Sequence, residues 1–269
     1  MSETARTPTV APAQALVIQI VLALGGFAIG TGEFVLMGLM PNVAADLGVT
    51  EPQVGHLISA YALGVVVGAP ILAILGARFC HKYLLIALMA FYALGNLASA
   101  VAGHYGMLLG FRFIAGLPHG TYFGVAALVA ASLVPVNQRA KAVSRVMIGL
   151  TLALLIGNPL ATVMGQNLEW RYAFAFVGLI ALITAIAVYR VVPVNQQEER
   201  RSPMAEIRAF GRREIWYPLA IGAIGFSGMF CVFSYLAPTL LEVTHVSEGW
   251  IPVGLFVFGL GGFVGNILG

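Results

Sequence analysis

The sequence predicts an all-α membrane protein, and two observations carry that prediction. Of its 269 residues, 59% are hydrophobic and 9% are charged, whereas a soluble domain carries about 25% charged residues. Apolar stretches of about 20 residues or more also recur along the chain, which is the length that a helix needs to cross about 30 Å of hydrocarbon. This composition excludes an ordinary soluble globular protein.

We expect eight membrane-spanning helices, the last of which is still apolar where the sequence stops at Gly269. Their predicted bounds are 15–40, 54–76, 83–103, 106–132, 143–165, 171–192, 215–241 and a final span from 250. They divide the chain into a cytoplasmic tail (1–14), a six-helix half (15–192), a cytoplasmic loop (193–214) and the start of a second half (215–269). Because the tail lacks a basic cluster and the first apolar stretch is too long for a signal peptide, we expect that span to remain as an anchor.

The placement of basic residues predicts the orientation in the membrane. If the N-terminus is cytoplasmic, 12 of the 14 Lys and Arg residues fall on the cytoplasmic side, and the outer loops carry only Arg171. The cytoplasmic set is Arg6, Arg78, Lys82, Arg139, Lys141, Arg145, Arg190, Arg200, Arg201, Arg208, Arg212 and Arg213. Since basic residues concentrate in cytoplasmic loops, we predict a multi-pass protein with a cytoplasmic N-terminus.

The seventh and eighth spans repeat the first and second at a shift of 197 residues. This register aligns Gly25 with Gly222, Pro41 with Pro238, Glu51 with Glu248, Gly64 with Gly261 and Gly68 with Gly265. Six spans, a loop and the start of a second copy form the layout of transporters built from two parallel halves. A second half as long as the first would give about 390 to 400 residues in all, so we expect this chain to be truncated at its C-terminus.

The first half contains several recognisable motifs. They are TGEFVLMGLMPNVAADLGV, SAYALGVVVGAP, RFCHKYLL, GFRFIAGLPHGTYFGV and GLTLALLIGNP, all within residues 31–159. In these motifs the chain resembles the major facilitator superfamily, and specifically the arabinose efflux permease-like transporters of its drug and sugar:proton antiporter branch. The resemblance implies proton-driven efflux of a sugar or a lipophilic drug across a bacterial inner membrane, by alternating access.

Glu33 and Arg112 are the charged residues that the sequence places deep in the bilayer. Glu33 lies eight residues before Pro41, which we expect to end the first helix, so its depth from that end is about 12 Å, and Arg112 is about 10 Å from the outer end of the fourth span. Since an isolated charge is costly there, the shared depth predicts an ion pair. The pair is either a static bridge or a switch in which protonation of Glu33 frees Arg112. RFIAG at Arg112 matches the efflux signature Arg-x-x-x-Gly, and the resemblance implies a role in proton coupling.

His119 is a third candidate for proton coupling. It follows Arg112 by seven residues, so it lies on nearly the same helix face and about 10 Å deeper. There it either relays protons or binds substrate, or it is a hydrogen-bonded core residue. Further polar candidates for a substrate cavity are Tyr61, Asn96, Thr121 and Tyr122.

The fifth and eighth spans contain the residues expected to form a gate. Gly149, Gly157 and Pro159 resemble the antiporter signature of the fifth helix, in which a glycine row ends at Gly-Pro. Small residues recur at every fourth position in both spans, at Ala153, Gly157, Ala161 and Gly165 and at Gly261, Gly265 and Gly269. Because small residues let helices approach closely, these stripes predict either a rocking seam between the two halves or simple tight packing.

The loop after the second span corresponds to the family signature Gly-x-x-x-Asp-Arg-x-Gly-Arg-Lys. Arg78 and Lys82 are retained, but Ala77 replaces the aspartate, so the two basic residues are either gate residues or charges that only set the topology. In the span itself, Gly64 and Gly68 form a small-residue pair. The resemblance implies the eleventh helix as their partner, and this sequence does not contain it.

The sequence contains no nucleophile elbow, phosphate-binding loop, metal cluster or catalytic carboxylate pair, so we do not expect an enzyme. We expect no cofactor besides the coupling proton, and as partners a small-molecule substrate and the lipid bilayer, without nucleic acid. Two alternatives to efflux stay open: an uptake symporter on the same fold, and a truncated chain without transport activity. A full-length chain is expected to be a monomer, and this one to need the missing C-terminal helices.

Overall fold

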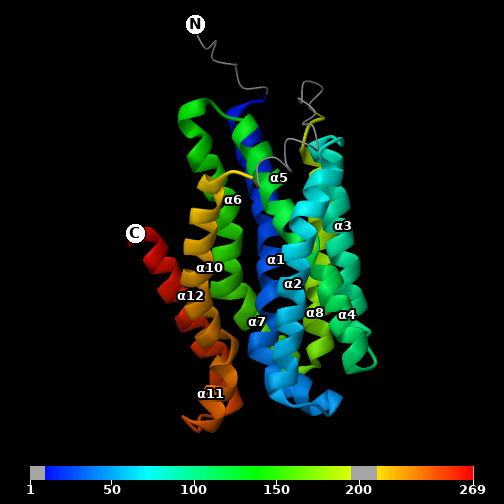
Figure 1. The fold of residues 1–269 in the computed structure, drawn as a ribbon, viewed down its shortest axis with the longest axis vertical. Helices are drawn as coiled ribbons and strands as arrows, with labels where there is room; N and C mark the ends of the chain where they lie inside the picture. Colours follow the sequence, from blue (N-terminus) through cyan, green and yellow to red (C-terminus); the bar gives the residue numbers. More distant parts are fainter. Residues whose placement is uncertain (1–9, 195–210, 269) are drawn as a thin grey trace, which may run out of the picture.

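The computed structural model describes residues 10–194 and 211–268. Within these ranges, eight helices or runs of helices are long and apolar enough to cross a membrane (Figure 1). The spans are α1 (Pro12–Leu47), α2 (Glu51–Gly76), α3 (His81–Ala100), α4 with α5 (Tyr105–Gly116 and His119–Ser132), α6 with α7 (Arg139–Leu152 and Asn158–Asn167), α8 (Trp170–Val191), α10 with α11 (Arg213–Ser234 and Leu236–Glu242) and α12 (Ile251–Leu268). The predicted all-α membrane fold is confirmed. Most of the predicted loop 193–214 lies outside the described residues.

Three short turns complete the spans. The 3-10 turns η1 (Val136–Gln138) and η3 (Glu248–Trp250) precede α6 and α12, and the π-helical turn η2 (Ala153–Gly157) joins α6 to α7. The breaks fall near prolines: Pro118 separates α4 from α5, and Pro159 stands in the first turn of α7. Breaks of this kind are tolerated in a membrane where neighbouring groups satisfy the freed backbone. The first break makes His119 the first residue of α5.

The first helix is longer than predicted. α1 continues through Pro41 to Leu47, and it ends at Gly48, whose left-handed backbone (φ 62°) lets its N–H bond to the carbonyl of Ala44. A proline inside a helix loses one hydrogen bond and crowds one carbonyl, and here the turns before it are buried against other helices. The prediction that Pro41 ends this helix is therefore wrong. Glu33 lies about 21 Å from the true helix end rather than 12 Å.

Glycines bring α2 and α4 into close contact. Gly64 and Gly68 lie against backbone carbonyl groups at the end of α4, and Gly116 of α4 lies against the carbonyl of Tyr61. A Cβ at any of these positions would collide with the backbone of the other helix. In this structure, α4 is therefore the partner of the Gly64 and Gly68 pair, and the contact places Tyr61 beside the turn that carries Arg112.

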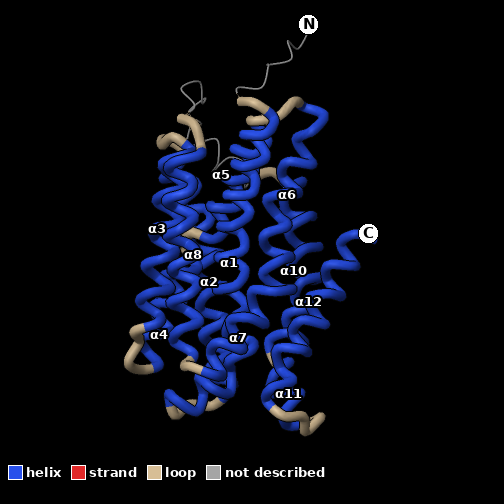
Figure 2. Tube along the Cα trace, turned by 180° about the vertical axis from the view of Figure 1, so that it is seen from behind, coloured by secondary structure: helices blue, strands red, loops and turns tan. Residues whose placement is uncertain are grey.

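The helices after the central loop pack on one side of the six-span bundle. α12 packs mainly on α7 and η2, whereas α10 contacts α1, and α12 diverges from the bundle towards its C-terminal end (Figures 1 and 2). One apolar cluster joins the two parts, and it consists of Phe34, Met37, Phe233, Ala237, Ile251 and Leu255. Nearby, Nε2 of Gln166 donates to the carbonyl of Glu248 at 3.2 Å. The two parts thus meet from the middle of the molecule to the end remote from the N-terminus.

The fifth and eighth spans do meet, but not through the predicted glycines of the eighth. Gly259 of α12 lies against the backbone of Leu154 in η2. At Gly261 and Gly265, no atom of another described element lies within 4 Å of where a Cβ would stand, and Gly269 lies outside the described residues. The predicted seam of small residues on both sides is therefore wrong.

The glycines of the fifth span pack on α1 within the first half. Gly149 lies against the carbonyl of Ala23, Gly157 against the side chain of Thr31, and Gly165 against the side chain of Leu39. Since α1 already occupies this stripe, α12 approaches the backbone of η2 instead. A π-helical turn widens a helix locally and is frequent at functional sites, and this one lies between α1 and α12.

Candidate functional site

Arg112 is fully buried within the first half, and three other spans surround its guanidinium. Nη1 donates to the carbonyl of Gly32 in α1 at 2.8 Å. Cζ lies 4.3 Å from the ring centroid of Tyr61 in α2 and 5.5 Å from that of Phe174 in α8. A carbonyl dipole and two aromatic faces thus stabilise the cation, since each presents negative potential to it.

The expected ion pair between Glu33 and Arg112 is absent. Within the described residues, the side-chain ion pairs within 4 Å join Arg171 to Asp46 and Arg212 to Glu214. The shared depth is correct, because Arg112 contacts Gly32, the residue before Glu33. The prediction of direct pairing is wrong because the guanidinium bonds to the α1 backbone rather than to the carboxylate.

Arg112 also retains unused hydrogen-bonding capacity. Its Nε and Nη2 are buried and have no hydrogen-bond partner in the part of the chain that the structure describes. Glu33 is half-buried and lies within electrostatic range of the guanidinium. An unpaired buried donor is unfavourable by about 1–3 kcal/mol, more when the group is charged. The arrangement therefore leaves Arg112 able to accept an anionic partner.

Tyr61 connects Arg112 to His119. While its ring lies under the guanidinium, its hydroxyl shares a hydrogen bond of 2.9 Å with Nδ1 of His119. His119 is half-buried and packs on Phe123, with ring centroids 5.3 Å apart. Arg112, Tyr61 and His119 are thus connected across α4, α2 and α5, and Glu33 stands beside them on α1, next to Gly32. We call these four residues the central polar set.

Helix α3 closes the space around Gly32. The hydroxyl of Tyr92 donates to the carbonyl of Ile29 at 3.1 Å, and Nδ2 of Asn96 donates to the carbonyl of Tyr92 at 2.9 Å. A Cβ on Gly32 would collide with the Tyr92 hydroxyl and stand 3.2 Å from Oδ1 of Asn96, which is buried without a partner in the described residues. Position 32 must therefore be glycine for α1 to lie this close to α3.

The other predicted cavity residues are not brought to this set. Oγ1 of Thr121 donates to the carbonyl of Ala69 at 3.1 Å, and the hydroxyl of Tyr122 donates to the carbonyl of Leu22 at 2.8 Å. Both side chains are buried and hold helices together. Their role in a substrate cavity has no support in this structure.

Arg78 and Lys82 lie near the turn between α2 and α3, which is at the end of the bundle that carries the N-terminus (Figure 1). Arg78 is exposed. Nζ of Lys82 lies 5.3 Å from the ring centroid of Tyr189 in α8. This contact stays within the first half, so a gate role for the two residues stays a prediction.

Three residues of the site were missed from the sequence: Gly32, Tyr92 and Phe174. Gly32 had a usable signal, because a glycine next to the only acid deep in the first span indicates close backbone approach. Tyr92 and Phe174 had none, since an aromatic residue of an apolar helix faces lipid as readily as a cation.

The fold and the site together define a class. Among the described residues, no group of three His, Cys, Asp or Glu side chains is placed to hold a metal ion. Within this fold of eight spans, the first half contains a buried arginine, a glutamate and a tyrosine–histidine pair, and ionisable residues within membrane spans typically mark ion and substrate pathways. This is the arrangement of a multi-pass membrane transport protein.

The comparison with known families agrees with that class. The model of the Major Facilitator Superfamily matches residues 22–269. The chain therefore belongs to the Major Facilitator Superfamily, as the sequence motifs predicted.

Similar proteins include two relatives and one solved fold. The inner membrane transport protein YdhP of Escherichia coli is 37% identical over 93% of this chain and 64% of its own length. A probable sugar efflux transporter of Helicobacter pylori is 30% identical over 94% of this chain and 65% of its own. A bacterial homologue of the lysosomal transporter Spinster, solved in an inward-facing conformation, shares the fold with a TM-score of 0.74 at 17% identity, over 94% of this chain and 61% of that one. The chain thus spans just under two thirds of the length of these proteins.

Proposed function

We propose that this chain belongs to a proton-coupled transporter that exports a small molecule, a sugar or a lipophilic compound, by alternating access, with Glu33 as the proton site. One observation carries the proposal: the buried guanidinium of Arg112 lies next to Glu33 but is not paired with it. In a permanent salt bridge, the carboxylate of Glu33 would contact the guanidinium of Arg112. An open pair leaves Glu33 able to exchange a proton.

The position of Glu33 links the proton to the contact between the two parts of the molecule. On one side, the preceding residue, Gly32, holds Arg112. On the other, the following residue, Phe34, and Met37 one turn later belong to the apolar cluster that meets α10, α11 and α12. A change of charge at Glu33 therefore acts on Arg112 and on the contact between the two parts.

Two states of the central polar set follow. With Glu33 protonated, we expect Arg112 to keep its hydrogen bond to the Gly32 carbonyl and its contact with the Tyr61 ring. With Glu33 ionised, its carboxylate is drawn towards the unpaired Nε and Nη2, because desolvated opposite charges attract strongly. His119 is the proposed relay, through its hydrogen bond with Tyr61. A ligand or proton shifts such a two-state element only when it interacts differently with the two states, and here the proton does.

The direction of transport rests on topology and on relatives. The basic residues support a cytoplasmic N-terminus, and in that orientation the two parts meet on the outer side. The cytoplasmic side is then the side on which an exported substrate would enter. A relative named as a probable sugar efflux transporter favours a sugar and favours export.

The test is transport in proteoliposomes that contain a pH-sensitive dye. A panel of pentoses and lipophilic dyes is applied, and substrate flux and internal pH are followed together. We expect opposite movement of substrate and protons, and loss of the proton signal in Glu33→Gln. Glu248→Gln, the same change at an exposed residue, is the matched control and should behave as the unmodified chain does. Movement of both in the same direction would indicate a symporter, and unchanged coupling in Glu33→Gln would exclude Glu33 as the proton site.

A further inference from the structure

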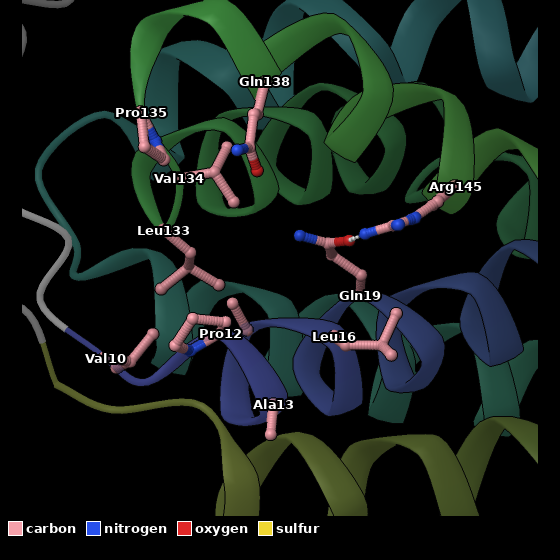
Figure 3. Close-up of a pocket in the computed structure, with 11 residues that line it drawn as sticks. Val10, Pro12, Ala13, Leu16, Gln19, Leu133, Val134, Pro135, Gln138 and Arg145 are labelled. Atoms are coloured by element: carbon pink, nitrogen blue, oxygen red, sulfur yellow. Dashed lines mark hydrogen bonds between the residues drawn. The ribbon is translucent and has the colours of Figure 1, made fainter.

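A second polar site lies at the end of the bundle that carries the N-terminus. A pocket of about 460 Å³ opens between the first turns of α1, the end of α5 and the start of α6 (Figure 3). Pockets for small molecules and cofactors span roughly 300–1,000 Å³. Its walls are mostly apolar, and their larger apolar side chains are Val10, Leu16, Leu133 and Val134.

Gln19 supplies a buried hydrogen-bond donor to this pocket. The residue is 1% exposed, and its Oε1 accepts a hydrogen bond from Nη1 of Arg145 at 3.0 Å. Its Nε2 has no partner in the described residues, and in Figure 3 it points away from Arg145 into the ring of lining residues. Because the amide oxygen is already used, the pocket offers an N–H group, and the missing partner is a hydrogen-bond acceptor.

The charge of the pocket selects an anionic acceptor. Among the described residues that line it, Arg145 is the only ionisable one and none is a carboxylate. Gln19 is seven residues into α1, about 10 Å from the helix start, and only four residues inside the predicted cytoplasmic end of the first span. A ligand that fits carries an anionic oxygen and an apolar body.

We propose that this pocket binds the phosphate of an anionic phospholipid, with Nε2 of Gln19 and the guanidinium of Arg145 as donors and Leu16 and Leu133 against the start of an acyl chain. Basic pockets between membrane helices on the cytoplasmic side are suited to anionic head groups. Inorganic phosphate offers the same oxygen chemistry but would leave the apolar walls uncovered, so the lining favours a lipid. The inference is independent of the proposed transport function.

Native mass spectrometry of the 269-residue chain in detergent tests the proposal, with phosphatidylglycerol and phosphatidylcholine as probes. We expect one phosphatidylglycerol to be retained in preference to phosphatidylcholine. Gln19→Leu should weaken its retention about tenfold, as the loss of a hydrogen bond to a charged group does. Leu133→Trp, which fills the apolar wall and leaves both donors in place, should weaken it by a similar factor. Arg139→Gln changes an exposed residue of α6, the helix that carries Arg145. It is the matched control and should change retention less than twofold.

Circular dichroism and elution volume establish that each variant is folded. Equal retention of the two lipids by the unmodified chain would overturn the proposal. So would retention that falls equally in Gln19→Leu and Arg139→Gln, because that result would indicate general charge attraction. Displacement of phosphatidylglycerol by millimolar inorganic phosphate would assign the pocket to free phosphate and overturn the lipid assignment.

Discussion

Two arginines of the first half illustrate two uses of a positive charge. At the end of the bundle remote from the N-terminus, Nη1 of Arg171 lies 2.8 Å from Oδ2 of Asp46, which also accepts from Nε1 of Trp170 at 3.0 Å. Both charged side chains are partly exposed, at 28% and 43%. In the interior, Arg112 is fully buried, yet it has a carbonyl and aromatic rings in place of a carboxylate.

The difference lies in what a change of charge would do at each place. The Arg171 cluster joins α1 to α8 within one half, and water screens it. The Arg112 site lies next to the contact between the two parts, and its nearest acid is unpaired. The exposed ion pair between Arg171 and Asp46 is suited to holding helices together. The buried Arg112 and the unpaired Glu33 are suited to a change of conformation when Glu33 gains or loses a proton.

The largest effect is expected at Arg112, and the same substitution at Arg171 serves as its control. Arg112→Lys keeps the charge but loses the flat guanidinium that lies on Tyr61 and Phe174. We expect coupled transport to fall at least about tenfold, because a charge-assisted hydrogen bond contributes about 1.5–3 kcal/mol. Arg171→Lys should change it less than twofold. Equal losses in the two variants would remove the distinction between the sites.

Gly32→Ala should have the next largest effect. The added methyl group meets the Tyr92 hydroxyl and Oδ1 of Asn96, and overpacking of a core typically costs about 1–3 kcal/mol. Thermal unfolding followed by circular dichroism measures the loss. Gly110→Ala, at a glycine of α4 with open space around it, should be neutral. A stable Gly32→Ala variant would show that α1 and α3 are less tightly packed than described.

Tyr61→Phe separates the two contacts that this side chain makes. The ring stays under Arg112 while the hydrogen bond with His119 is lost, so we expect about fivefold slower coupled transport, equivalent to about 1 kcal/mol. The pH dependence of transport should also change, because the proposed relay is interrupted. Tyr105→Phe removes a hydroxyl that bonds to the carbonyl of Gln53 and serves as the control. If both variants match the unmodified chain, His119 is only a packing residue.

The smallest effect is expected at the exposed pair. Asp46→Asn removes the charge opposite Arg171 but keeps an acceptor for Trp170, so stability should fall by less than about 1 kcal/mol. That corresponds to a thermal midpoint lower by at most about 2–4 °C, with transport per folded molecule unchanged. Loss of transport without loss of stability would assign Asp46 a role in transport and contradict its purely structural role.

The sequence predicted the spans and the shared level of Glu33 and Arg112, because apolar length and helical rise indicate both, but it misplaced the end of the first helix from which the depth of Glu33 was measured. It did not predict the course of α1 beyond Pro41, since tertiary packing compensated for the missing hydrogen bond. Nor could depth alone predict the partner of Arg112: the carbonyl of Gly32 and the carboxylate of Glu33 lie at one level, and only the rotation of α1 against α4 separates them. The predicted seam between the fifth and eighth spans was wrong for a similar reason. The spacing of small residues does not specify which of two neighbouring helices packs on them, and here that helix is α1.

The proposed coupling requires Glu33 to take up and release a proton while Arg112 stays in place. Infrared difference spectroscopy of the purified chain over a pH titration tests it most directly, without knowledge of the substrate. We expect a protonated carboxyl band that grows as the pH falls and disappears as it rises, is absent in Glu33→Gln and remains in Glu248→Gln. A carboxyl spectrum that is the same in Glu33→Gln and in the unmodified chain at every pH would contradict it.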